Sequence, residues 1–461
     1  MLAVVVKIRQ TKRCSHEKLI LDEGGAKMYK RYKDVSLILK IVIGIIVGAV
    51  LGVMVPSWSF IDVLGKLFVG ALKAIAPLLV FLLIMSAISK YRSGAKNHFG
   101  TVIVLYLSAT LFSSIAAVAV SYLFPIKLVL PGAMKIAESA PKDLGTVVTS
   151  LLTNAVANPI SALVEGNYLA ILFWSLLIGS GLRLTSAVTK KVVTELADTV
   201  SAVAQNVIQF APFGIVGLLH ESLSKTGVKG VMAYGQLLML LVATMVFVYL
   251  VVYPFMVWLM TRQNPYPLTF WTLKVSGIPA FFTRSGAVNI PINLKASKDL
   301  GLNEESYAIS IPLGGSANSG GAAITVSIMT LATANTMGVH VSIFLALLLC
   351  FLSAISATGV SGIAGGSLLL IPMAASLFGI SNDIAMQVVG IGFIIGVVQD
   401  SVETAVNSAS DLLFTATAEY ADDRREGHPV DIRAKVKAAG KGTAEVVTPE
   451  KANEAEESEQ V

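Results

Sequence analysis

Long apolar runs recur through the first half of the chain and leave few folds open to it. They lie near residues 35–56, 60–89, 100–125, 146–183, 199–223 and 232–260. A bilayer core about 30 Å thick needs roughly 20 apolar residues per helix, and each run is long enough. Since 54% of the residues are hydrophobic and only 14% are charged, a water-soluble globule would expose too much apolar surface. We therefore expect an all-α, polytopic protein embedded in a lipid bilayer.

The fourth run is the least regular of the six. Asn154, the pair Asn158-Pro159 and the string Glu165-Gly166-Asn167 interrupt it and could divide it into shorter helices. We count residues 146–183 as one composite span.

Basic residues beside the apolar runs predict the orientation. Residues 1–33 carry nine Lys or Arg against three acids, and no apolar stretch among them is long enough for a signal peptide. The basic string after Met28 would suit the start of a membrane protein, so N-terminal sequencing should test whether residues 1–27 are native. Further basic groups that we place in the cytoplasm are Lys90, Arg92, Lys96, Arg183, Lys190 and Lys191. The net charge of +6 therefore indicates orientation in a membrane rather than binding to nucleic acid.

From about residue 265, small and polar residues break the apolar segments at membrane depth. Residues 268–300 contain the string from Thr283 to Pro291, which a continuous membrane helix would not choose. Residues 341–378 repeat the design with a break from Ser356 to Gly362. Each segment predicts a helical hairpin that enters and leaves on one side, and the full span between them makes the two open from opposite faces, as in transporters. The alternative is two ordinary helix pairs whose glycines allow close packing.

The last apolar span, about 384–418, carries a polar stripe. Offsets of 0, 3, 4, 7 and 11 place five residues on one helical face: Asp400, Glu403, Thr404, Asn407 and Asp411. A charged group at the bilayer centre costs at least ~2.5–3.5 kcal/mol, so three carboxylates predict a polar site. The alternative is a stripe that packs against backbone polar groups elsewhere in the bundle.

The preceding span, about 305–335, holds a glycine-rich string from Pro312 to Gly321. Each Gly weakens a helix by roughly 1 kcal/mol relative to Ala, so local unwinding is expected there. Freed carbonyl oxygens, with the side chains of Asn318 and Asp411, would suit a small hard cation such as sodium. The N–H groups at both hairpin tips would face an anion such as a substrate carboxylate.

Three strings resemble the dicarboxylate/amino acid:cation symporters, and most of all the members that carry serine and threonine with sodium. They are Ala280-Phe281-Phe282-Thr283-Arg284-Ser285, Ser381-Asn382-Asp383-Ile384-Ala385-Met386-Gln387-Val388-Val389 and Gln399-Asp400-Ser401-Val402-Glu403-Thr404-Ala405. The resemblance extends from about Leu37 to Tyr420. It implies eight transmembrane helices, two re-entrant hairpins, inverted repeats, a homotrimer, and a transport domain that slides through a fixed scaffold. It also implies a bacterial inner-membrane protein with both termini in the cytoplasm.

The same resemblance implies a division of the chain. Residues 1–33 form a basic cytoplasmic tail, and residues 34–264 supply helices 1–6, which are the scaffold and part of the transport domain. Residues 265–420 form hairpin 1, helix 7, hairpin 2 and helix 8, the core for substrate and ion. Residues 421–461 are expected to be a disordered cytoplasmic tail.

Site residues follow from the resemblance, position by position. The implied sodium ligands are the Gly314 carbonyl, Asn318, Asn407 and Asp411, with Ser108 and Thr110 as further candidates. The implied substrate contacts are Ser285 and Gly286 at the first tip, Val360 and Gly362 at the second, and Asp400, Glu403, Thr404 and Asn407 on the last span.

Two departures from the family pattern refine these expectations. Where members commonly have Asn-Met-Asp-Gly-Thr, this chain has Asn318-Ser319-Gly320-Gly321-Ala322, so fewer sodium ions are expected to be coupled. Glu403 stands where members with acidic substrates have an arginine that would clamp a side-chain carboxylate. A glutamate repels that carboxylate, which favours serine and threonine over aspartate and glutamate. Replacing Glu403 by Arg should then depress serine uptake, while alanine is harder to exclude.

Other functions remain open at this point. An intramembrane protease is suggested by Gly359-Val360-Ser361-Gly362, but a serine nucleophile needs a nearby base, and we expect all five histidines in tails or loops: His16, His98, His220, His340 and His428. A channel could also use a polar stripe, although doubled hairpins predict alternating gates. Proton coupling, another neutral amino acid or a dicarboxylate are further alternatives. No Gly-x-x-x-x-Gly-Lys-Ser/Thr motif supports an ATP-driven pump.

Overall fold

A computed structural model describes residues 35, 37–90, 99–130, 149, 153, 155–360, 365–427 and 430–442. These residues form helices and connecting turns, and no strand occurs among them. The elements of the first half are α3 (Leu37–Met54), η1 (Ser59–Ile61), α4 (Asp62–Lys90), α5 (Phe99–Leu123), α7 (Pro159–Glu165), α8 (Tyr168–Leu182), α9 (Ala187–Ile208), α10 (Ala211–Phe247), η2 (Val248–Val252) and α11 (Tyr253–Thr261). Those of the second half are α12 (Tyr266–Thr272), η3 (Leu273–Gly277), α13 (Ile278–Thr283), α14 (Gly286–Asp299), α15 (Glu304–Ala317), α16 (Gly320–Met337), α17 (Ile343–Val360), η4 (Gly366–Leu370), α18 (Ile371–Ser376), α19 (Asn382–Arg425) and α20 (Ile432–Gly442).

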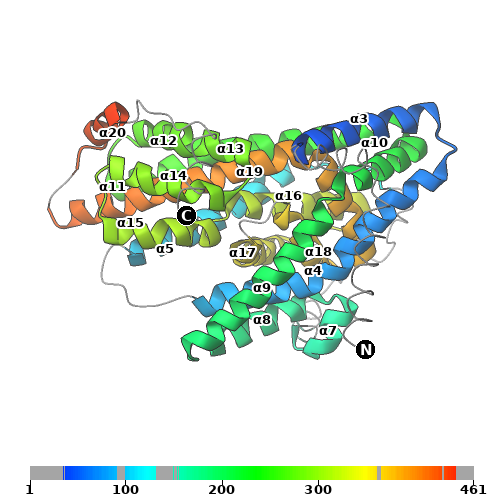
Figure 1. Cartoon of the computed structure of the whole chain (residues 1–461), viewed down its shortest axis with the longest axis horizontal. Coiled ribbons are helices and arrows are strands. Elements are labelled where there is room, and N and C mark those ends of the chain that lie inside the picture. The colour runs from blue at the N-terminus through cyan, green and yellow to red at the C-terminus, as the bar shows by residue number, and fades with distance from the viewer. Residues whose placement is uncertain are drawn as a thin grey trace, which may run out of the picture.

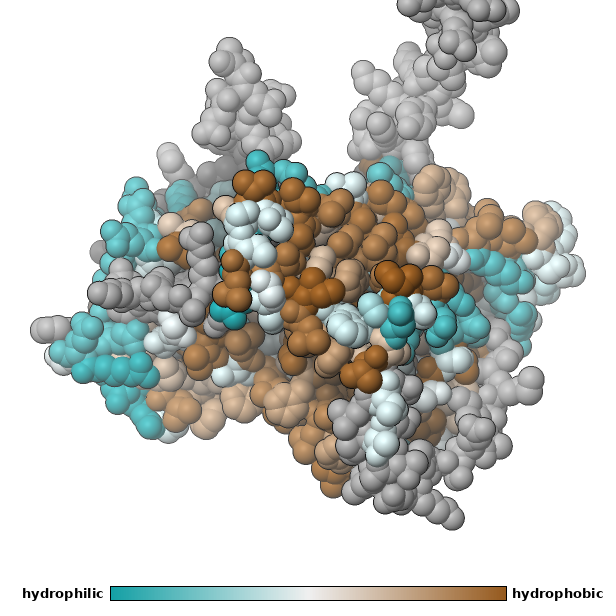
Figure 2. Space-filling model, turned by 90° about the horizontal axis from the view of Figure 1, so that it is seen from below, coloured by the Kyte–Doolittle hydropathy of each residue, from teal (hydrophilic) through white to brown (hydrophobic). Residues whose placement is uncertain are grey.

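Several helical segments of the described chain are long and apolar enough to cross a membrane. Four qualify alone, namely Ser59–Ser89, Gly100–Leu123, Val231–Thr261 and Asn382–Arg425, and a bent pair from Ala187 to Lys225 makes a fifth. Apolar side chains also cover much of the outer surface. Figure 2 shows a broad hydrophobic area across the middle of one face, with hydrophilic patches toward both ends. This distribution suits a protein whose middle faces lipid.

Two expected spans are divided in the structure, the first at a proline that begins a helix and the second at a glycine and a capping asparagine among the interruptions noted in the sequence. The expected span 199–223 is interrupted, because α9 ends at Ile208, α10 begins at Ala211, and the two meet at an angle of 53°. Pro212 lies in the first turn of α10, where its missing N–H is tolerated, but it cannot continue α9. The described part of 146–183 is two helices, since Gly166 ends α7 with φ +70° and Asn167 caps α8.

Three glycines let α3 lie directly against α10. Gly44, Gly48 and Gly52 are four residues apart and share one helical face. A Cβ at Gly44 would lie 2.5 Å from the Pro212 carbonyl oxygen, and one at Gly48 would lie 2.9 Å from the Val216 carbonyl oxygen. Any larger residue would push the helices apart. This spacing of glycines is a signal for close helix packing in membranes, although it lies within an otherwise plain apolar run.

The first expected hairpin break lies where it was predicted, whereas the break expected from Ser356 to Gly362 was placed too early, because α17 stays helical through Val360. In hairpin 1 the first arm, α12 to α13, ends at Arg284, whose φ of +52° turns the chain into α14. The two arms are joined where Asn289 Nδ2 donates a hydrogen bond to Ser276 Oγ at 2.9 Å. In hairpin 2, α17 is followed by Gly365, at φ +69°, and then by η4 and α18. Residues 361–364 lie outside the described part of the chain.

The glycine-rich span is broken as the composition predicts. α15 ends at Ala317, Asn318 and Ser319 leave the helical conformation, and α16 begins at Gly320. α19 then passes beside this break and beside both hairpins (Figure 1). Its 44 residues span about 66 Å, at about 1.5 Å per residue, so α19 carries one continuous face past every part of the core.

The expected disordered tail was wrong for its first part. α19 continues to Arg425, and α20 packs against α12 and α14 at one end of the molecule (Figure 1). Residues 443–461 lie outside the described part of the chain.

Candidate functional site

Asp400 lies between the ends of the two hairpins. Its Oδ2 accepts a hydrogen bond from Arg284 Nε at 2.7 Å, and its Oδ1 accepts one from the Gly365 N–H at 3.1 Å. The Arg284 and Asp400 side chains are only 11% and 6% exposed. A small cavity of about 20 Å³ lies beside them and is lined by both residues and Gly365. Asp400 therefore faces the ends of the two hairpins and not a water-exposed surface.

The first tip presents backbone donors beside this carboxylate. Ser285 is extended and caps α14, where its hydroxyl accepts a hydrogen bond from the Val288 N–H at 3.4 Å. Gly286 is the first residue of α14, so the opening N–H groups of this helix lie next to Arg284. Such groups bind anions well. At the second tip, Val360 ends α17 and nothing is described of its side chain, while Gly362 lies outside the described residues.

The Glu403 carboxylate lies against α16 and η4. Its Oε2 accepts hydrogen bonds from Thr325 Oγ1 at 2.7 Å, Ser367 Oγ at 2.9 Å and Gln399 Nε2 at 2.6 Å. The residue is 7% exposed. These three donors stabilise one buried oxygen, so Glu403 is held in place before any substrate arrives.

Thr404 and Asn407 continue the stripe between these two carboxylates and the helix break. The Thr404 hydroxyl donates to the Asp400 carbonyl oxygen at 2.8 Å. Asn407 Oδ1 accepts a hydrogen bond from the Gly321 N–H at 2.8 Å and thereby caps the start of α16. Both side chains are half-buried, which leaves part of each available to a ligand.

Asn318 and Asp411 form the candidate cation site. Asn318 Nδ2 donates to Asp411 Oδ1 at 2.9 Å, while Asn318 Oδ1 is buried and has no hydrogen-bond partner. Gly314 lies against the same carboxylate, since a Cβ there would be 2.7 Å from Asp411 Oδ1. The Gly314 carbonyl oxygen accepts a hydrogen bond from the Asn318 N–H at 2.9 Å. An orphaned amide oxygen beside one carboxylate fits a small monovalent cation that prefers oxygen ligands. No cluster of three His, Cys, Asp or Glu occurs among the described residues.

The two further sodium candidates are placed differently. Thr110 lies at the break, where its hydroxyl oxygen accepts a hydrogen bond from the Ser319 N–H at 3.3 Å. Ser108 is two residues earlier and so lies on the opposite side of α5, in an apolar pocket between α5 and α11 that Arg425 also lines. The structure thus brings Thr110, but not Ser108, to the helix break.

Gly320 occupies the position at which the family pattern has a carboxylate. A Cβ there would lie 2.0 Å from the Tyr253 hydroxyl and 2.7 Å from Ser113 Oγ, which is too close for any side chain. Tyr253 and Ser113 are themselves hydrogen-bonded at 2.9 Å. Two neutral hydroxyls therefore fill the space that a carboxylate would need.

One histidine, His220, does not lie where the sequence predicts. His220 was expected in a loop or tail, but it is fully buried within α10, where Nδ1 lies 2.7 Å from Asp62 Oδ1 and Nε2 lies 3.1 Å from the Val55 carbonyl oxygen. His220 lies near the end of the expected span 199–223, and α10 continues well past it to Phe247. His220 ties α10 to the corner between α3 and α4, far along the chain from the hairpins.

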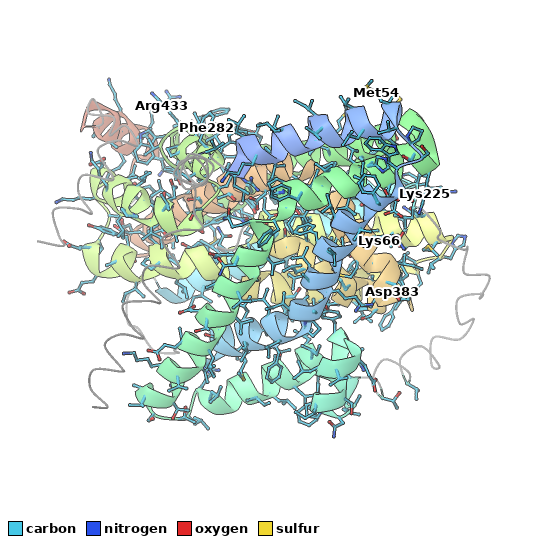
Figure 3. The ribbon with its side chains drawn as sticks, turned by 45° about the vertical axis from the view of Figure 1, so that its right-hand side comes forward. Met54, Lys66, Lys225, Phe282, Asp383 and Arg433 are labelled. Carbon is cyan, nitrogen blue, oxygen red and sulfur yellow. The ribbon has the colours of Figure 1, made fainter. Side chains whose placement is uncertain are left out.

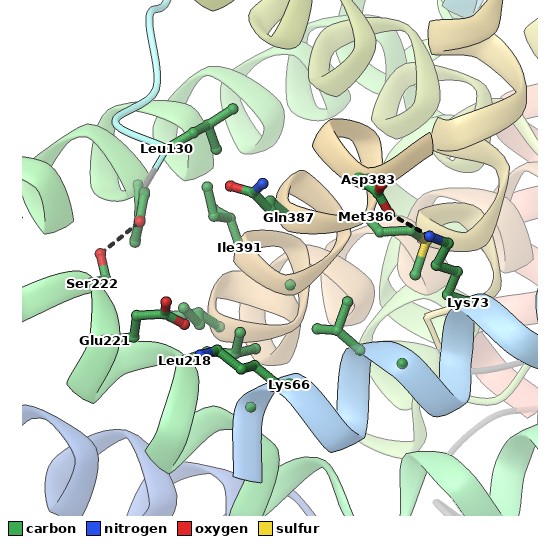
Figure 4. A pocket seen from close by; sticks show the side chains of 16 residues that line it. Lys66, Lys73, Leu130, Leu218, Glu221, Ser222, Asp383, Met386, Gln387 and Ile391 are labelled. Atoms are coloured by element: carbon green, nitrogen blue, oxygen red, sulfur yellow. Dashed lines mark hydrogen bonds and ion pairs between the residues drawn. The ribbon is translucent and has the colours of Figure 1, made fainter. Parts of the chain in front are cut away.

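A second pocket separates α4 and α10 from α19. It has a volume of about 340 Å³, and side chains of all three helices line it (Figure 4). Lys73 of α4 forms an ion pair across it with Asp383 at the start of α19. Lys66 and Glu221 line the pocket from α4 and α10. Because the pocket touches neither hairpin tip, it is a gap between helices of the two halves rather than the substrate site.

Comparisons with known proteins agree with this geometry. The sodium:dicarboxylate symporter family model matches residues 37–420. The chain is 58% identical over 407 residues to the serine/threonine transporter SstT of Enterococcus faecalis, covering 88% of this chain and 97% of that protein. It is 51% identical over 393 residues to SstT of Streptococcus agalactiae, covering 85% and 98%, and 51% identical over 390 residues to SstT of Bifidobacterium adolescentis, covering 84% and 90%.

Proposed function

Because the chain belongs to the sodium:dicarboxylate symporter family, we propose that it imports serine and threonine together with sodium by secondary active symport. The observation that carries the proposal is Asp400, held between the first hairpin tip and the residue that follows the second hairpin break. A buried carboxylate there is a partner for the α-ammonium group of an amino acid. It becomes available when the two tips part.

The ends of the substrate are matched by groups of opposite charge. The α-ammonium binds Asp400 and displaces Arg284 from it. The α-carboxylate then binds the freed guanidinium and the N–H groups at the start of α14, beside Ser285 and Gly286. Thr404 and Asn407, which are half-buried beside Asp400, are the polar groups left for the substrate hydroxyl. Such a site favours binding of a small zwitterionic amino acid that carries one hydroxyl group.

Sodium binds at the break between α15 and α16. The Gly314 carbonyl, Asn318, Asn407 and Asp411 hold the ion, whose charge offsets that of the Asp411 carboxylate in a buried place. Asn407 belongs to both sites, because its side chain caps α16 and lies on the substrate face of α19. Filling the ion site therefore orders the helix face that the substrate needs, which couples the two. The hydroxyls that replace a carboxylate at Gly320 favour fewer coupled ions.

The larger arrangement follows the family pattern. Eight membrane helices and two re-entrant hairpins form each subunit of a homotrimer, with both termini in the cytoplasm of a bacterial cell. The part that includes both hairpins, α15, α16 and α19 slides against a fixed part that includes α3, α4 and α10. The pocket of about 340 Å³ between α4, α10 and α19 supports such a sliding boundary, since the two sides are not tightly packed there.

Uptake of radiolabelled serine into proteoliposomes tests the proposal. Sodium, potassium and proton gradients are imposed separately, and only the sodium gradient is expected to drive accumulation above equilibrium. Asp411→Asn should raise the sodium concentration for half-maximal uptake by about tenfold or more, which corresponds to ~1.4 kcal/mol of lost ion binding. Asp198→Asn, at an exposed position on α9, is the matched control. Accumulation driven by a proton gradient alone, or single-channel currents, would contradict symport with sodium.

A further inference from the structure

The C-terminal helix α20 is hydrogen-bonded to, and packed against, the first hairpin and the turn before it. Gln263, in the turn before α12, donates from Nε2 to the Val430 carbonyl oxygen at 2.5 Å, and its Oε1 accepts from the Ile432 N–H at 3.1 Å. Ile432 and Ala439 are only 1% and 2% exposed, because α20 packs this side against α12 and α14. The helix is therefore held by its apolar side and moves with hairpin 1.

The opposite side of α20 is basic and faces outward. Residues 432–442 contain four Lys or Arg and no acid, and one of the four, Lys435, lies against Gly301 on the docked side. Arg433 and Lys437 are exposed, and Figure 3 shows Arg433 at the outer end of the molecule. Asp431, just before the helix, is engaged in capping, since its Oδ1 accepts hydrogen bonds from the Arg433 and Ala434 N–H groups. A helix with one docked apolar side and one basic side is typical of contact with an anionic surface.

Other basic residues lie at the same end of the molecule. Arg262 ends α11 immediately before hairpin 1, and Arg424 at the end of α19 donates from Nη1 to the Met260 carbonyl oxygen at 2.9 Å. In the proposed topology this end lies at the cytoplasmic leaflet, which carries anionic phospholipids. A cluster of Lys and Arg residues near such a surface is typical of a site for lipid headgroups.

We propose that α20 binds anionic phospholipid headgroups of the cytoplasmic leaflet through Arg433 and Lys437 and makes serine uptake depend on them. The inference rests on the proposed function for the direction of the membrane. Since α20 is fixed to hairpin 1, any movement of the hairpin against the bilayer changes the distance between the basic face and the headgroups. A ligand that contacts one position better than the other shifts the balance between them. The lipid thus acts on hairpin 1 without entering the substrate site.

The first test measures binding apart from transport. Amide hydrogen exchange of residues 430–442 is followed in the full-length protein in nanodiscs of phosphatidylcholine, with or without one third phosphatidylglycerol. Phosphatidylglycerol should slow exchange in α20 of the wild type severalfold, and high salt should reverse the effect. Arg433→Gln with Lys437→Gln should abolish the slowing, whereas the charge-preserving pair Arg433→Lys with Lys437→Arg should retain it. Equal exchange rates in both lipids for the wild type would overturn the proposal.

The second test measures uptake in vesicles of the same two compositions. The wild type should transport serine at rates that differ at least twofold between them, and the double Gln variant should transport equally in both. Lys127→Gln with Lys191→Gln removes the same charge elsewhere and should behave as the wild type. If the double Gln variant takes up serine normally in phosphatidylcholine while the lipid effect persists, the lipid site is wrong and the symporter assignment stands. If no protein transports serine in either lipid, the symporter assignment fails instead.

A chain that ends at Gly442 separates the lipid from a rival partner within the protein. Residues 454–459 carry four glutamates, which could pair with the same basic face. Lipid binding predicts that phosphatidylglycerol still slows exchange in α20 of the shortened chain. If shortening speeds exchange in α20 and phosphatidylglycerol has no effect on either chain, the acidic segment is the occupant and the lipid proposal is wrong.

Discussion

The guanidinium Nε of Arg284 lies 2.7 Å from Oδ2 of Asp400, and this ion pair joins the first hairpin tip to the middle of α19. The two residues are 116 positions apart in the sequence. Each charge is nearly buried, so each depends on the other for its stability in an apolar protein interior. A zwitterion carries the same two charges. It can therefore replace the internal partner of each residue at once, which gives the substrate a way to open the tips without leaving a charge unpaired.

Removing one member of this pair should harm folding and transport differently. Arg284→Gln leaves the Asp400 carboxylate without its counter-ion, which typically costs roughly 3–5 kcal/mol in a buried pair. The thermal unfolding temperature of the purified protein in detergent should fall clearly. Adding Asp400→Asn removes the orphaned charge and should restore most of that stability. Serine uptake should be lost in both variants and in Asp400→Asn alone.

Asp198→Asn, which removes an exposed carboxylate from α9, controls for charge alone and should change neither property. Substantial serine uptake by Asp400→Asn would remove this carboxylate from the substrate site. Wild-type stability of Arg284→Gln would show that the ion pair is not needed for folding.

Glu403 should influence selectivity through its charge. Glu403→Gln keeps a carbonyl oxygen to accept from Thr325 and Ser367 but removes the negative charge. Serine uptake should stay within about threefold of wild type, and aspartate should compete roughly tenfold better, a change of ~1.4 kcal/mol. Glu403→Arg places a cation among three donors and should destabilise the protein as well as stop uptake. Competition assays measure the selectivity of both variants, and thermal unfolding measures their stability. If aspartate competes with serine no better in Glu403→Gln than in the wild type, the charge of Glu403 does not determine which substrate is bound.

Sequence patterns predicted the features that depend on the residues of a single segment, such as a polar helix face or a break in a helix. The stripe from Asp400 to Asp411 was predictable because buried charge is costly, and the break at Asn318 was predictable because its glycine-rich neighbours disfavour a helix. The partner of Asp400 was not, since only the left-handed turn at Arg284 places that guanidinium beside α19. Pro212 did signal the bend before α10, but the apolar run around it concealed the signal. Docking of α20 depends on Gln263, whose role no periodic pattern marks.

The space at Gly320 should tolerate no side chain while Tyr253 keeps its hydroxyl. Gly320→Ala places a methyl group 2.0 Å from that hydroxyl, and overpacking of this kind costs typically 1–3 kcal/mol. Gly320→Asp should be worse, with little folded protein and no uptake. Tyr253→Phe removes the obstructing oxygen and should recover part of the stability of Gly320→Ala. Thermal unfolding in detergent measures each effect.

Gly315→Ala is the matched control, because a Cβ there meets its nearest neighbour, Ile290, only at 3.9 Å. It should be close to wild type in stability and uptake. In the wild type, the dependence of uptake on sodium should be less steep than in family members that have the carboxylate. A stable Gly320→Asp protein with steeper sodium dependence would show that the position can still hold an ion.

Movement of α19 against α4 should be blocked by a covalent link between Lys73 and Asp383. Both side chains are well exposed, at 42% and 77%, so their ion pair is worth only about 0.2–1 kcal/mol and can break during each cycle. A short crosslink between Lys73→Cys and Asp383→Cys, in a chain whose two native cysteines are replaced, cannot break. Serine uptake should fall by more than tenfold on crosslinking and return on reduction. A link between Lys66→Cys and Glu221→Cys, which line the same pocket from α4 and α10, joins two helices of the fixed part and should leave uptake intact. If the first link leaves uptake unchanged, α19 does not slide past α4, and transport must then proceed by opening the hairpin tips within a stationary core.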